Sequence, residues 1–158
     1  MIYCKVEPAM SPLNEPSGTE TILVVDDEAA VLSIASAFLV RRGYDILQAT
    51  SGAQALEICK QRNSGIQLLV TDVTMPGMTG PQLAECLHLL YPEMRVLYMS
   101  GYGDYAFEQN RSFPMKWFLR KPFTSDALAT LVRQALDEPR KREPGRQLSD
   151  SETRKAVG

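Results

Sequence analysis

The chain lacks the features that mark several common protein classes. No stretch approaches the roughly 18 apolar residues of a membrane-spanning helix. The first eighteen residues contain three prolines and no apolar segment of the signal-peptide kind. The formal net charge is −2, so there is no basic excess to neutralise nucleic acid phosphates. We therefore expect a cytoplasmic protein that acts on neither a membrane nor a nucleic acid.

Cysteine and histidine are also scarce. The three cysteines, Cys4, Cys59 and Cys86, have neither metal-ligand nor disulfide spacing. We interpret Cys59 and Cys86 as small apolar residues of helices, which agrees with a reducing compartment. The one histidine, His88, lies opposite the leucines of a predicted helix. It is expected at the surface and not as a phosphate donor.

A length of 158 residues suits one sizeable core. Residues 1–20 are rich in Pro, Ser and Glu and are predicted to be a flexible leader. Residues 139–158 mix basic and acidic side chains with few apolar ones, which predicts a flexible charged tail. The structured domain is therefore expected over residues 21–138.

Within that domain, short apolar runs alternate with helical patterns. Continuous runs at 22–25, 68–70 and 96–99 are typical of buried strands, whereas 44–49 alternates like an edge strand and 117–119 is a short last strand. In the first helix Val31, Ala35 and Phe38 recur on the expected core side, and 101–115 offers only a weak helix. The alternation predicts an α/β fold, a flavodoxin-like doubly wound sheet of five parallel strands in the order 2-1-3-4-5, with helices on both faces.

Polar side chains follow the predicted strands. Asp26 and Asp27 come after the first, Asp72 closes the third, Ser100 the fourth and Lys121 the fifth. Each alone is ordinarily a turn residue, a helix cap or a solvated charge, but the carboxyl ends of parallel strands share one edge, where ligands bind. Converging carboxylates repel one another and need a cation. Their hard oxygens suit Mg²⁺.

Four sequence blocks carry a family resemblance. VVDDE, TDVTMPGMTG, MSG and LRKPF resemble the signature blocks of response-regulator receiver domains of two-component signalling. The similarity covers about residues 20 to 138 and is greatest to receivers appended to hybrid histidine kinases. It implies that the domain over 21–138 is a receiver.

The resemblance implies a function for the matching positions. Asp72 would accept a phosphoryl group, with Mg²⁺ as cofactor, from a histidine kinase or a histidine phosphotransfer protein. The other implied roles are magnesium binding by Asp26, Asp27, Asp72 and the backbone carbonyl of Thr74; phosphoryl contact by Lys121 and Ser100; switching by Ser100 and Phe118; and a cis peptide bond at Pro122.

A helical wheel suggests where a partner docks. Ala30, Ile34 and Ala37 fall together on one flank of the first helix, and Phe123 could extend this patch. Small apolar residues beside Asp27 suit the close approach of a partner helix. The alternative is that Ile34 only widens the apolar core stripe.

Other functions remain open at this point. A haloacid-dehalogenase-like phosphatase would need a second acid two residues after Asp72, where this chain has Thr74. A receiver-like binding module independent of phosphorylation would be expected to lack the acceptor, the acidic pair or the lysine. We expect a monomer that is not an enzyme beyond weak self-dephosphorylation and has no DNA-binding output domain. It would act through an unidentified protein target, as a free regulator, a phosphate relay or sink, or a receiver separated from a hybrid kinase.

Overall fold

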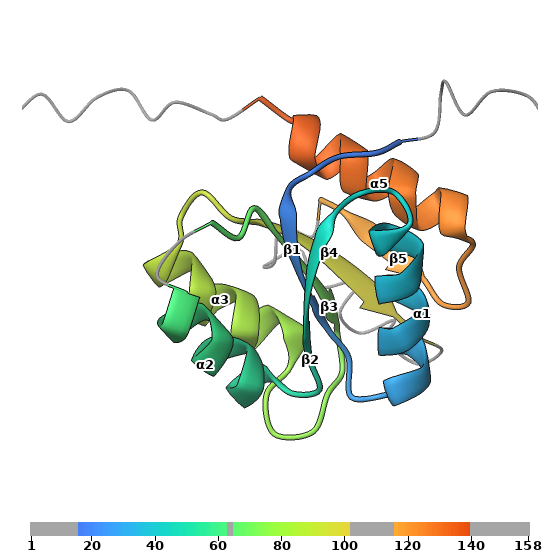
Figure 1. Cartoon of the computed structure of the whole chain (residues 1–158). Helices are drawn as coiled ribbons and strands as arrows, with labels where there is room; N and C mark the ends of the chain where they lie inside the picture. The colour runs from blue at the N-terminus through green and yellow to red at the C-terminus, as the bar shows by residue number, and fades with distance from the viewer. Residues whose placement is uncertain (1–15, 63–64, 102–115, 140–158) are drawn as a thin grey trace, which may run out of the picture.

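The computed structural model describes residues 16–62, 65–101 and 116–139. They form one parallel sheet of five strands in the order β2-β1-β3-β4-β5 (Figure 1). The strands are β1 (Thr21–Val25), β2 (Asp45–Ala49), β3 (Leu68–Asp72), β4 (Arg95–Ser100) and β5 (Phe118–Arg120). The described helices are α1 (Ala29–Val40), α2 (Gly52–Arg62), α3 (Gly80–Leu90) and α5 (Ser125–Asp137). The predicted sheet and strand order are confirmed.

Helices cover both faces of the sheet (Figure 1). Along β1, Ile22 and Val24 pack into a core with α1 and α5, whereas Leu23 and Val25 pack into a second core with α2 and α3. All four of these side chains are fully buried. This two-sided burial explains why the central strands are continuous apolar runs and do not alternate.

Side-chain caps stand at the starts of α2, α3 and α5. Thr79 accepts a hydrogen bond from the Gln82 amide, and the Gln82 side chain accepts one from the Thr79 amide, which completes a capping box before α3. Thr124 accepts a hydrogen bond from the Ala127 amide and caps α5. Before α2 a capping box is only half formed. Ser51 accepts from the Gln54 amide, but Gln54 accepts from the amide of Thr50.

The buried stripe of α1 differs from the predicted one. Its fully buried positions are Leu32, Ala35, Ser36 and Leu39. The predicted core residues Val31 and Phe38 are only partly buried and pack at its side. The buried stripe is therefore rotated around the helix relative to the predicted one, and the polar residue Ser36 faces the core.

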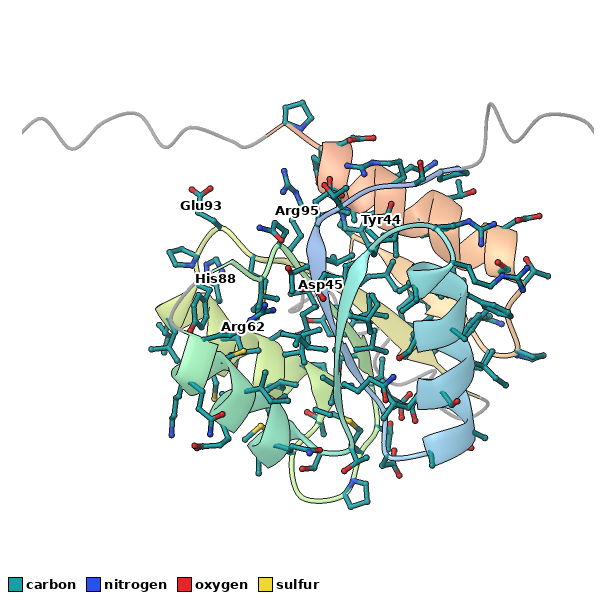
Figure 2. The ribbon with its side chains drawn as sticks, viewed as in Figure 1. Tyr44, Asp45, Arg62, His88, Glu93 and Arg95 are labelled. Atoms are coloured by element: carbon teal, nitrogen blue, oxygen red, sulfur yellow. The ribbon has the colours of Figure 1, made fainter. Side chains whose placement is uncertain are left out.

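The remaining surface agrees with several expectations. His88 is exposed on the outer side of α3 (Figure 2). Cys59 is buried and Cys86 is exposed, both on helices. None of the helices in the described ranges has the length and hydrophobicity needed to cross a bilayer. The predictions for residues 1–15, the segment 102–115 and the tail from 140 onward lie outside the described residues.

Candidate functional site

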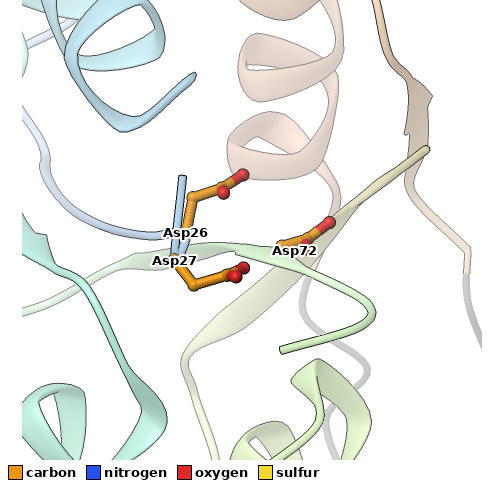
Figure 3. Close-up of side chains that lie close together, drawn as sticks. All are labelled: Asp26, Asp27 and Asp72. Carbon is orange, nitrogen blue, oxygen red and sulfur yellow. The ribbon is translucent and has the colours of Figure 1, made fainter. Parts of the chain in front are cut away.

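Three aspartates converge at the carboxyl edge of the sheet. Asp26 and Asp27 follow β1, and Asp72 is the last residue of β3, the neighbouring strand. One carboxylate oxygen from each lies within 4.8 Å of the other two. Figure 3 shows the three side chains lying close together. The convergence follows from the topology, because β1 and β3 pair in parallel with Val25 opposite Thr71.

Asp26 is the most enclosed of the three acids. It is fully buried, and its amide donates a hydrogen bond to the Ala49 carbonyl of β2 at 3.2 Å. Its carboxylate Oδ1 accepts a hydrogen bond from the Glu28 amide at 2.9 Å. The acid is thus tied to the start of α1 as well as to the sheet.

Lys121 supplies the positive charge of the site. Its Nζ lies 2.7 Å from Asp26 Oδ2 and 3.1 Å from Asp72 Oδ1, with Glu28 Oε1 at 4.0 Å. Its amide donates to the Ser100 carbonyl at 2.7 Å, and the Lys121–Pro122 peptide bond is cis. Burial acts to lower the pKa of Lys121, but the carboxylates of Asp26 and Asp72 outweigh it and raise this pKa above its ordinary value. The ammonium therefore stays charged between the two acids.

The charges of this cluster leave room for a further cation. Three carboxylates face one ammonium, so like charges a few ångströms apart are only partly compensated. Asp27 is exposed, which leaves the cluster open to solvent on one side. A carboxylate set of hard oxygens with access for water fits a small divalent cation such as Mg²⁺.

Two further predicted residues lie at the ends of β4 and β5. Ser100 closes β4 and is 1% exposed, and its Oγ has no hydrogen-bond partner among the described residues. Phe118 opens β5 opposite Tyr98 and is partly buried. Burial raises the pKa of the Tyr98 phenol to about 12, so this neighbour of Phe118 stays neutral.

The other predicted positions lie around this cluster. Thr74 is exposed, two residues beyond Asp72. Ala30, Ile34 and Ala37 are exposed on the side of α1 away from its buried stripe, and Ile34 is 50% exposed. The alternative that Ile34 widens the core stripe is therefore wrong. Phe123 is partly buried against the core beneath α1 and α5.

Two residues near the acids are absent from the predicted site residues, although each is the last residue of a signature block. Glu28 lies within an ion-pair distance of Lys121, and Gly80 packs against the main chain of Asp72. Glu28 adjoins the acidic pair, so its position is a weak signal for this contact. Gly80 ends the signature block TDVTMPGMTG, eight residues beyond Asp72, but a residue without a side chain gives no indication of the group that it contacts.

Known proteins are similar to this chain over most of its described residues. Residues 22–133 match the response regulator receiver domain family. Sensor kinase CckA of Brucella abortus (strain 2308) is 39% identical over 123 residues, which are 77% of this chain and 13% of that protein. Sporulation initiation phosphotransferase F of Bacillus subtilis (strain 168) is 28% identical over 118 residues, or 74% of this chain and 94% of that protein.

A solved structure agrees with these relatives. A response regulator receiver protein from Sinorhizobium medicae WSM419 has a TM-score of 0.66 and 34% identity, covering 75% of this chain and 94% of that one. The chain thus spans almost all of some relatives and only a small part of the sensor kinase. Both the sequence match and the shared fold lead to one conclusion: the chain belongs to the response regulator receiver domain family.

Proposed function

We propose that this receiver, spanning residues 21–138, accepts a phosphoryl group on Asp72 from a phosphohistidine. The observation that carries the proposal is the ion pair between Asp72 Oδ1 and the partly buried ammonium of Lys121, beside two further carboxylates. A carboxylate oxygen of Asp72 would attack the phosphorus atom. The P–N bond to histidine would break as the P–O bond forms, and the imidazole would leave with a proton.

The surrounding residues have distinct proposed roles. Lys121 would hold an oxygen of the phosphoryl group, since it already contacts the acceptor carboxylate. The unpartnered Ser100 hydroxyl could donate a hydrogen bond to another oxygen, and this contact would bias the position of Phe118. Asp26, Asp27, Asp72 and the carbonyl of Thr74 would hold Mg²⁺, which supplies charge neutralisation for the transferred group.

The proposed outcome is a change in protein contacts, not turnover of a substrate. Relay or storage of phosphate fits a chain similar to a sporulation phosphotransferase, and action beside a kinase fits the similarity to CckA. Both of these possible functions use the same site. Incubation of the phosphorylated chain with a histidine phosphotransfer protein would separate them, because a relay passes the group onward to a histidine.

Acetyl phosphate labelling tests the acceptor. The native chain should gain one phosphoryl mass with Mg²⁺ and none with EDTA. Asp72→Asn keeps the side-chain shape but removes the nucleophile, so its mass should not change. Intact-mass spectrometry measures both, and a labelled Asp72→Asn protein would refute the assignment.

We further propose that the phosphohistidine partner docks on the exposed small residues of α1. Ala30 and Ala37 lie on the helix face opposite the buried stripe, with the half-exposed Ile34 between them. Ala30 is three residues from Asp27, so a helix seated there would lie beside the acids. Phe123 would extend the patch from the loop after Lys121.

Charge placed on this face should block transfer from the partner. Ala30→Glu should leave acetyl phosphate labelling intact but slow transfer from the phosphohistidine by at least about tenfold, because an unpaired charge at an interface is costly. Val40→Glu is a matched control, since Val40 is also exposed on α1 but lies at the end remote from Asp27. Equal transfer rates in the two variants would move the docking surface elsewhere.

A further inference from the structure

Gly80, the first residue of α3, lies directly against the main chain of the acceptor. A Cβ atom added there would be 2.2 Å from the Asp72 carbonyl oxygen and 3.1 Å from its carbonyl carbon. It would also be 3.2 Å from Thr71 Cγ2. Contacts below 3.0 Å are essentially never seen for real Cβ atoms, so any other residue must displace its neighbours.

The requirement at this position is space and not backbone conformation. Positive φ angles occur at Gly43, Gly65 and Gly77 among the described glycines, but not at Gly80. A residue with a side chain could therefore adopt the backbone angles of Gly80 without strain. Only the close approach to Asp72 explains why glycine is needed.

The groups that a methyl would meet have little freedom to move. Thr71 and Asp72 belong to β3, which is paired on both sides by β1 and β4. The Val73 amide donates to Met99 O at 2.9 Å, and Gly80 N donates to Val73 O at 2.9 Å. The start of α3 is thus fastened to the residue that follows the acceptor. A methyl would have to push α3 or the Asp72 peptide by about 0.8 Å to reach a 3.0 Å contact.

We propose that Gly80 is a positioning residue for Asp72. The first turn of α3 packs on the acceptor's main chain through Gly80 and thereby fixes its carboxylate relative to Lys121. This inference rests on the proposed function of Asp72. A displacement near 1 Å in a reacting group can slow a reaction by about 100-fold. An added methyl at Gly80 therefore slows phosphorylation by displacing the main chain of Asp72, and leaves the side chains around the phosphoryl group unchanged.

Gly80→Ala tests this against a matched glycine. Gly65→Ala also introduces strain, because Gly65 has φ +91, but nothing lies within 4 Å of its added Cβ and it precedes β3 at the other end of the strand. Both variants are compared at a temperature where circular dichroism shows them folded. We expect acetyl phosphate labelling to slow by about 10- to 100-fold in Gly80→Ala and to stay within about twofold in Gly65→Ala.

The carboxyl ¹³C NMR shift of Asp72 provides a readout that loss of stability alone would not move. It should change in metal-free Gly80→Ala and remain native in Gly65→Ala. Native labelling in Gly80→Ala, or slow labelling with an unchanged shift, would overturn the role of Gly80 and leave Asp72 as the acceptor.

Failure of the native chain to be labelled would instead refute the proposed function. The ¹³C shift would then decide the role of Gly80 alone: a change supports it and no change overturns it. If Gly80→Ala does not fold in buffer, the same measurements are made in trimethylamine N-oxide, which favours the compact state.

Discussion

Two buried serines of this protein have hydroxyl groups in different surroundings. Ser36 Oγ and Ser100 Oγ both lack a hydrogen-bond partner among the described residues. Ser36 lies on the buried stripe of α1, whereas Ser100 ends β4 next to the backbone of Lys121. Each unsatisfied hydroxyl costs the fold about 1 kcal/mol or more. Only Ser100 stands where a phosphoryl oxygen could become its partner.

Alanine at either serine should therefore stabilise the protein but have different effects on its response. Ser36→Ala and Ser100→Ala should each raise the free energy of unfolding by up to about 1 kcal/mol, measured by urea denaturation. Only Ser100→Ala should weaken the NMR shifts that beryllofluoride induces around Phe118. Intact shifts in Ser100→Ala would show that this hydroxyl does not couple the site to Phe118.

At the scale of elements, the loop between β3 and α3 is packed against the start of α2. A Cβ added to Gly52, the first residue of α2, would lie 2.8 Å from Met78 Sδ and 3.0 Å from Met78 Cβ. Met78 belongs to the loop that carries Thr74. The contact of Gly52 with Met78 therefore links the position of α2 to the position of this loop.

A double-mutant cycle measures this link. Alanine normally suits a helix better than glycine, so a loss of stability in Gly52→Ala can be ascribed to the contact. We expect Gly52→Ala to lower the free energy of unfolding by about 1–2 kcal/mol through overpacking. Met78→Ala should remove most of that loss in the double variant, as measured in urea. Additive effects would mean that Met78 is not the obstacle.

The elements themselves were largely predictable, because burial on both faces leaves continuous apolar runs and helices leave a regular spacing. The strand-end residues of the acidic cluster followed from the same pattern. The orientation of α1 did not follow from the sequence pattern, since Ser36 is polar yet faces the core. Nor did the contact of Gly80 with Asp72, because the packing of the first residue of a helix on a strand end has no sequence period.

At the scale of the whole molecule, Arg133 links the segment before β1 to the end of α5. It forms ion pairs with Glu20, just before β1, at 2.8 Å and with Asp137 of α5 at 2.8 Å. Its Nη1 also donates to the Ser17 carbonyl at 3.2 Å. The hydrogen bond from Arg133 holds the pKa of the Glu20 carboxyl below its ordinary value.

This pKa shift predicts a pH-dependent contribution to stability. A lowered pKa in the folded state stabilises the fold above the unfolded pKa, near 4.3, and the gain disappears as the pH falls through the folded pKa. Glu20→Gln should lower the free energy of unfolding at pH 7 by less than about 1 kcal/mol, since the pair is partly exposed. Urea denaturation should show this difference shrinking toward pH 3.

Glu57→Gln provides the control for this prediction. Glu57 is exposed on α2 and forms no ion pair within the part of the chain that the structure describes. Its substitution should leave stability nearly unchanged at both pH values. A pH-independent loss in Glu20→Gln would mean that the ion pair with Arg133 is not its source.

The contacts of Arg133 have a consequence for how this unit can be combined with other proteins. Ser17 and Asp137 contact the same guanidinium, so both ends of the described core lie beside α5 (Figure 1). The segment before β1 adjoins the start of the strands, whereas the acids lie beyond their ends. Insertion of the unit into a host loop, or its circular permutation through a short linker, would thus leave the acidic cluster undisturbed.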